Sequence, residues 1–167
     1  YHAFDGCSGL ESIVIPEGVV IIGDRAFEGC SSLKSITIPE KVTSIGDSTF
    51  YRCSSLESIE IPKGVTSISS WAIYECRSLQ KIIMHGDAPS ADGYTFGMVD
   101  NMVIYVPKNA KGYDAYPWNE YKIVYGDNSE DYKKGDVNED GTVDIKDLQI
   151  ILRSVCEKIK LTDRQKT

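Results

Sequence analysis

Apolar residues recur at a fixed distance of 23 positions through the first half of the chain. Leu10, Leu33, Leu56 and Leu79 keep this step, and several other columns are in phase with them. A single unit of this length cannot bury its own apolar face, whereas stacked copies bury Leu, Ile, Val and Phe between them. The period therefore predicts a solenoid. The further columns are Cys7, Cys30, Cys53 and Cys76; Ile13, Ile36, Ile59 and Ile82; Pro16, Pro39 and Pro62; Val19, Val42 and Val65; and Ile22, Ile45 and Ile68.

Each unit contains one clear strand pattern. The stretches SIVIP, SITIP and SIEIP place two Ile residues two positions apart, directly before a proline. This predicts a short strand with one buried face, which ends at a residue that has no N–H group. The Ala-Phe segment of each unit suits a helical turn or an irregular arc on the opposite side. The expected fold class is an α/β repeat solenoid with a 23-residue period, followed by a small loop and helix near the C-terminus.

The repeat stretch AFEGCSSLKSITIPEKVTSIGD resembles the BspA-like leucine-rich repeat family of bacterial surface proteins. The resemblance covers residues 1–85 as regular repeats, and residues 86–125 are expected to form a degenerate repeat and a C-terminal cap. The segment KGYDAYPWNEY resembles the cap that is common in that family, and seven of the ten Tyr residues lie at Tyr94 or later. These aromatic residues either cover the open end of the stack or form a recognition site. The resemblance implies a secreted, cell-surface bacterial protein.

Five cysteines in an exported protein raise the question of disulfide bonds. Four of them occupy one column of the repeat, so their Cβ vectors run parallel, and this arrangement suits a bridge poorly. A small, weakly polar side chain suits burial between copies of itself. We therefore expect a stack of free thiols, with Cys156 free as well.

Composition and charge exclude several functions. The net charge of −7 and the pI of about 4.8 argue against nucleic-acid binding, which requires basic surfaces. No apolar run approaches the roughly 20 residues that span a bilayer. The only histidines are His2 and His85, and no nucleophile elbow, phosphate loop or zinc spacing is present. Glu11, Lys34, Glu57 and Gln80 read as a solvated charge ladder, and we expect no enzyme activity.

A calcium loop is predicted near the C-terminus, in GDVNEDGTVDIKDLQIILRSV. Counting from Asp136, oxygen donors fall at the positions that an EF-hand-type loop requires, and Gly141 stands sixth, where such a loop turns sharply. The alternative is a solvated acidic turn without an ion. Residues 126–134 are expected to be a linker, and apolar residues after the loop follow helical spacing. The predicted ligands are Asp136, Asn138, Asp140, the carbonyl of Thr142, Asp144 and Asp147.

The loop with an exiting helix and no entering helix resembles the first segment of dockerins, over residues 135–167. That resemblance implies calcium-dependent binding to a cohesin module of a scaffoldin. Dockerins carry two such segments, and this chain shows one. The positions that would contact a cohesin are Ile145, Lys146, Leu152, Arg153 and Glu157.

The resemblances together imply a non-catalytic, cellulosome-type surface component, in which the repeats recognise an unidentified ligand and the dockerin docks to a cohesin. The alternative is a cell-surface adhesin that binds a host protein or a glycan and whose calcium loop is purely structural. A third interpretation is an accessory module of an enzyme whose catalytic domain lies outside residues 1–167. The chain starts within a repeat, so we expect it to be a fragment.

Overall fold

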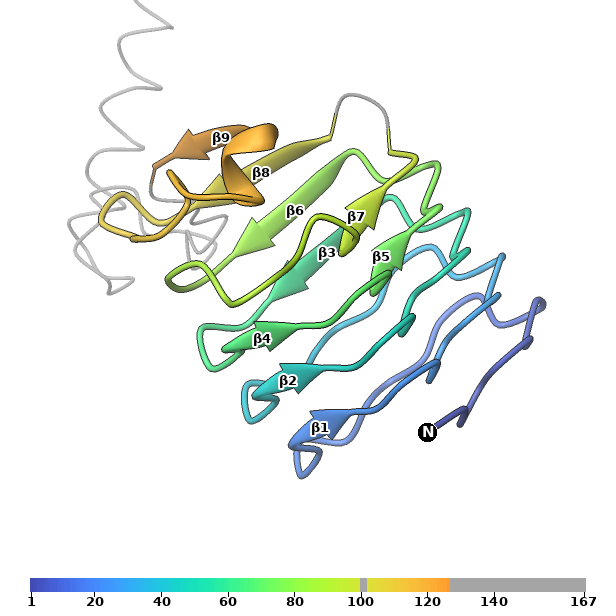
Figure 1. Cartoon of the computed structure of the whole chain (residues 1–167). Coiled ribbons are helices and arrows are strands. Elements are labelled where there is room, and N and C mark those ends of the chain that lie inside the picture. The colour runs from blue at the N-terminus through green and yellow to red at the C-terminus, as the bar shows by residue number, and fades with distance from the viewer. Residues whose placement is uncertain (100–101, 127–167) are drawn as a thin grey trace, which may run out of the picture. The chain divides into compact units, whose positions relative to one another are not determined.

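The computed structural model describes residues 1–99 and 102–126, and these residues form a solenoid of parallel strands (Figure 1). One sheet contains β1 (Ile21–Ile22), β2 (Ser44–Ile45) and β4 (Ser67–Ile68). Ile22 pairs with Ile45, and Ile45 pairs with Ile68, so each coil advances by 23 residues. The predicted period is confirmed.

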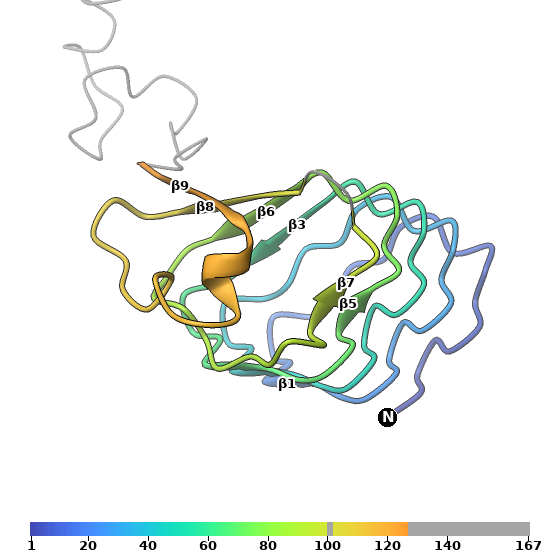
Figure 2. The same cartoon turned by 45° about the horizontal axis from the view of Figure 1, so that its top comes forward.

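Two further sheets complete the coils. The longest, in the order β3-β6-β8-β9, contains β3 (Ser58–Ile61), β6 (Lys81–Met84), β8 (Val103–Val106) and β9 (Lys122–Tyr125). A small sheet pairs β5 (Ile73–Tyr74) with β7 (Phe96–Gly97). Figure 2 shows the coils nearly end-on, with the three rows of strands arranged around a common interior.

The coils shorten towards the C-terminal end of the described residues. In the β3 sheet, Ser58 pairs with Lys81, a step of 23 residues. Lys81 then pairs with Val103, a step of 22, and Val103 pairs with Lys122, a step of 19. The strand register therefore continues in space after the sequence repeat has decayed.

The α-helical part of the predicted α/β class is wrong for the described residues, in which the one helical element is the 3-10 helix η1 (Trp118–Glu120). The Ala-Phe segments are turns and short strands. Each full coil has two residues with left-handed backbone in this region, for example Arg25 with φ 54° and Gly29 with φ 68°. An α-helix cannot continue through such residues, so the fold is a β-solenoid.

The interior is built from columns of identical residues. Leu33, Leu56 and Leu79 are at most 1% exposed. The rings of Phe4, Phe27 and Phe50 stack with centroid distances of 5.3 and 5.6 Å and an interplanar angle of 2°. Because each strand pairs with its copy in the next coil, equivalent side chains meet face to face along the stack.

The cysteine column is confirmed as free thiols in the described residues. Each buried thiol donates a hydrogen bond to a main-chain carbonyl of the preceding coil: Cys30 to Phe4 at 3.2 Å, Cys53 to Phe27 at 3.2 Å, and Cys76 to Phe50 at 3.1 Å. Burial raises the pKa of Cys30 to about 11 and that of Cys76 to about 12. The thiols therefore stay protonated and act as donors that link one coil to the next.

Aromatic residues pack on the last phenylalanine of the stack. The ring of Phe96 contacts Trp118 at 5.2 Å and Tyr121 at 5.4 Å between centroids, in edge-on geometry. The indole of Trp118 donates to the carbonyl of Pro89 at 3.1 Å, and the hydroxyl of Tyr113 donates to the carbonyl of Gly86 at 3.1 Å. Buried Tyr and Trp require such partners for their polar atoms.

Close stacking requires glycine at one turn. A Cβ atom at Gly46 would lie 2.5 Å from Oδ1 of Asp24 and 2.6 Å from its backbone nitrogen. We predict that Gly46→Ala lowers the free energy of unfolding by about 1–3 kcal/mol, because the added methyl group forces two coils apart. Urea unfolding measures this loss. Gly18→Ala is the matched control, since nothing lies within 4 Å of its Cβ; equal losses in the two variants would contradict the steric explanation.

Candidate interaction surface

One edge of the solenoid has left-handed backbone in every coil. We call it the turn edge and define it as residues 24–30, 47–53, 70–77 and 93–98. Two columns of residues with positive φ run along this side of the stack, which parallel register aligns from coil to coil. The first column is His2, Arg25, Ser48 and Trp71, and the second is Gly6, Gly29, Arg52, Glu75 and Met98.

The second column changes from glycine to large side chains. Gly6 and Gly29 adopt φ 69° and 68° without a Cβ, whereas Arg52, Glu75 and Met98 adopt φ 60°, 57° and 54°. A non-glycine residue in this region costs on the order of 1 kcal/mol or more, and such costs concentrate at functional sites. The chain thus places long side chains at positions where glycine is the less strained residue.

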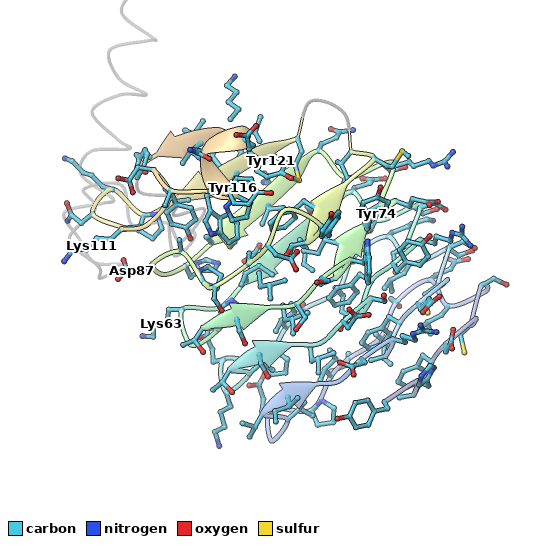
Figure 3. The ribbon with its side chains drawn as sticks, in the orientation of Figure 1. Lys63, Tyr74, Asp87, Lys111, Tyr116 and Tyr121 are labelled. Carbon is cyan, nitrogen blue, oxygen red and sulfur yellow. The ribbon has the colours of Figure 1, made fainter. Side chains whose placement is uncertain are left out.

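Tyrosines of successive coils stack along the turn edge. The rings of Tyr51 and Tyr74 lie 6.1 Å apart with an angle of 31°. The next residue in the column is Gly97, where a Cβ atom would lie 2.3 Å from the ring of Tyr74. Glycine therefore leaves room for the Tyr74 ring to lie across the following coil. In Figure 3, Tyr74 lies at the side of the stack away from Lys63, Asp87 and Lys111.

Glu75 connects this ladder to two arginines. Its carboxylate accepts a hydrogen bond from the Tyr51 hydroxyl at 3.1 Å and one from Nε of Arg52 at 3.3 Å. Nη2 of Arg77 lies 3.6 Å from the same carboxylate, and the Arg52 guanidinium lies 4.9 Å from the centroid of the Tyr51 ring. Desolvation opposes ionisation, but the hydrogen bonds from Tyr51 and Arg52 hold the pKa of Glu75 below its usual range.

Large apolar side chains lie beside this network. Trp71 is 43% exposed, and its ring lies 6.0 Å from that of Tyr94, which is 64% exposed. Met98 is also 64% exposed. Tryptophan, tyrosine and arginine are the residues that dominate binding energy in protein interfaces. The turn edge therefore has the composition of an interface.

The arginines are confined to this edge. In the part of the chain that the structure describes, the three arginines are Arg25, Arg52 and Arg77, and all three lie on the turn edge. Nε of Arg25 lies 3.5 Å from Oε2 of Glu28, an oxygen that is buried and has no hydrogen-bond partner among the described residues. The described lysines lie elsewhere along the chain.

A second concave feature lies over the β3 sheet. It is a groove of about 240 Å³ lined mainly by polar side chains. His85 contacts Glu60 within it, with Nε2 3.1 Å from Oε2. The predicted charge ladder runs along the same row of coils, and the ion pair between Lys34 and Glu11, at 3.8 Å, confirms its first step. The polar lining residues are Ser35, Thr37, Glu40, Ser58, Glu60 and His85.

The predicted calcium ligands lie outside the described residues. Asp136, Asn138, Asp140, Thr142, Asp144 and Asp147 form that set, and the predicted cohesin contacts lie there too: Ile145, Lys146, Leu152, Arg153 and Glu157.

Two searches of the described residues gave negative results. Residues 1–99 and 102–126 contain no group of three or more His, Cys, Asp or Glu side chains that could hold a metal ion. None of the helices in these residues has the length and apolar character needed to cross a membrane.

The parallel coils, buried leucine and isoleucine columns and short strands before proline define a leucine-rich repeat solenoid. A family model described as BspA type leucine rich repeat region, with six copies, matches residues 1–117. The chain belongs to this family, whose members are typically non-catalytic. The match ends before residue 135, and the comparisons give no support to the dockerin resemblance.

Two solved structures resemble the chain. A leucine-rich repeat protein from T. pallidum, TpLRR, shares 26% identity at a TM-score of 0.50, over 65% of this chain and 55% of that one. A leucine-rich repeat protein from Bacteroides ovatus shares 28% identity at a TM-score of 0.54, over 73% of this chain and 32% of that one. This chain thus spans about half and about a third of these two relatives. A search of curated proteins gave no significant match.

Sequence reasoning did not identify the turn edge. Its signal was present in two columns of the repeat, in which glycine gives way to Arg52, Glu75 and Met98, and Glu28 gives way to Tyr51 and Tyr74. A column that changes from small to large and aromatic residues marks a surface, provided that the column is known to point outwards. The period alone does not supply that direction.

The ion-pair network of Glu75 predicts a pH dependence. Because the folded-state pKa of Glu75 is depressed, its stabilising contribution is complete above the unfolded-state pKa, near 4.5, and is lost as the pH falls through the lower folded-state value. We predict that the wild type loses more stability between about pH 5 and pH 3 than Glu75→Gln does.

Urea unfolding at several pH values measures this difference. Glu57→Gln, on the charge ladder of another face, serves as the control and should follow the wild type. A wild type and a Glu75→Gln variant with parallel profiles would show that the network makes no net contribution.

Proposed function

We propose that this chain is the non-catalytic recognition module of a bacterial surface protein, and that its repeats bind a protein partner through the turn edge. One observation carries the proposal. Trp71, Tyr94 and Arg52 are exposed together on successive coils of an otherwise regular stack. Interface energy is concentrated in such residues because they combine large contact area with directed polar groups.

The family supports this reading over an enzymatic one. Its members are bacterial, often surface proteins, and typically non-catalytic. A solenoid offers a long, rigid edge on which side chains of several coils line up, so binding requires little loss of conformational freedom. The two solved relatives are longer than this chain, and its role within a whole protein is part of the proposal.

Binding to an array of purified extracellular proteins tests the proposed surface. We predict that Trp71→Ala weakens binding of any captured protein by about 2 kcal/mol or more, as expected for a hot-spot residue. Val14→Ala is the matched control, because Val14 is 89% exposed and apolar but lies outside the turn edge. Binding that survives Trp71→Ala but is lost on Glu60→Gln would move the interface to the groove over the β3 sheet.

We further propose that residues 136–147 bind calcium. The support is the sequence alone: six oxygen donors at the spacing of a calcium loop, with Gly141 at the sixth position. Two consequences are distinguishable. The ion is either structural, in an adhesin-type protein, or it organises residues 135–167 for docking to a cohesin. The family match, which covers the repeats alone, favours the adhesin.

Calorimetry with calcium tests the loop. We predict that Asp136→Ala and Asp140→Ala each abolish calcium uptake, because converging carboxylates supply the charge that holds the ion. Asp114→Ala, which lies in the repeat region, is the control and should keep full uptake. Full affinity in either loop variant would contradict the ligand assignment.

A panel of cohesins, with calcium and then with chelator, separates the two roles. Binding that the chelator abolishes and that Lys146→Ala or Arg153→Ala weakens would support docking. Calcium uptake without binding to any cohesin would support the structural ion.

A further inference from the structure

We infer that the turn edge selects a partner of a particular chemistry: an acidic, extended segment of a protein, whose carboxylates bind Arg52 and Arg77 while its backbone lies against Tyr51, Tyr74 and Trp71. This inference rests on the proposed function and specifies its ligand. Three features of the turn edge support it.

The first feature is the difference in exposure between the charges. The side chains of Arg52 and Arg77 are 61% and 70% exposed, whereas Glu75, which neutralises one positive charge, is 18% exposed. Arg25 and Glu28 repeat this arrangement one coil earlier, at 51% and 23%. A molecule approaching the edge therefore meets guanidinium groups first, and the carboxylates lie below them.

The second feature is the unused capacity of the guanidinium groups. Glu75 engages Arg52 through Nε and Arg77 through Nη2, whereas a guanidinium carries five N–H donors in a fork that matches a carboxylate. Glu75 already accepts from Tyr51 and Arg52. It thus fixes the arginines in place without satisfying them, and an incoming carboxylate finds them pre-organised.

The third feature is the spacing and shape of the aromatic residues. Tyr51 and Tyr74 stand on adjacent coils with centroids 6.1 Å apart, and Trp71 is in the same turn as Tyr74. The rings of Tyr51 and Tyr74 are tilted by 31°, and those of Trp71 and Tyr94 by 40°, so they form a stepped ridge and not a flat platform. A stepped ridge suits the alternating side chains of an extended peptide better than the flat faces of sugar rings.

Nearby aspartates do not cancel this preference. Asp24 accepts a hydrogen bond from the backbone N–H of Asp47 at 2.9 Å. Asp47 accepts one from the Ser48 hydroxyl at 2.8 Å, and Asp92 accepts one from the backbone N–H of Tyr94 at 2.9 Å. These carboxylates are engaged in shaping their own turns. The chain as a whole carries a charge of −7, so a cationic edge stands out against an acidic protein.

Selection from a random library of 12-residue peptides on the intact chain tests the inference. We predict that the selected peptides are enriched in Asp and Glu. Their affinity should fall by about tenfold or more on the double variant Arg52→Gln/Arg77→Gln, because a fixed guanidinium pair is lost. Lys63→Gln is the matched control: it removes the same charge from an exposed position away from the turn edge (Figure 3) and should leave affinity unchanged.

The outcomes separate this inference from the proposed function. Selected peptides without an acidic bias, whose binding falls with Trp71→Ala but not with the double arginine variant, would overturn the acidic partner and leave the interface in place. Failure to select any peptide, or binding that no turn-edge variant changes, would overturn both. If the double variant unfolds at a lower temperature, Arg52→Lys/Arg77→Lys keeps the charge, and the loss of the fork alone should still weaken binding.

Discussion

The structure depends on main-chain hydrogen bonding between coils in a constant register. Phe27 donates its N–H to the carbonyl of Thr49, Phe50 to that of Ala72, and Ile73 to that of Thr95, at 2.8 to 3.0 Å. Because the step is constant, every residue stands beside its own equivalents, and a good contact made once is made again in the next coil. The buried leucines, the stacked phenylalanines and the thiol-to-carbonyl bonds all follow from this register.

The same constraint explains how a surface can be built without disturbing the core. Residues in outward columns are free to change, and their side chains still line up along the stack. The turn edge uses this freedom: the left-handed backbone at Gly29 is retained at Arg52 and Glu75, and the side chains added there form one network with Tyr51. Glu75 lies at the centre of that network, so it links local strain to the orientation of both arginines.

The end of the described solenoid shows what replaces the repeat when its sequence is lost. Val103 and Lys122 continue the strand pairing at steps shorter than 23 residues. Large aromatic residues then fill the volume that a further coil would occupy beside Phe96. Their polar atoms bond to carbonyls of the coil before them, at Pro89 and Gly86. The hydrogen bonds between coils thus outlast the repeat that established them.

The sequence by itself determined the period, the inward columns and the free state of the cysteines, because each of these is a property of one residue type repeated in phase. It also identified a stretch with calcium-loop spacing, which lies outside the described residues. The tertiary structure alone decided that the Ala-Phe segments are left-handed turns, since a 23-residue period fits a helix or an arc equally well. It alone brought Tyr51, Arg52, Glu75 and Arg77 into one network, because whether columns point inwards or outwards, and which of them adjoin, depends on how the coil closes and not on spacing along the chain.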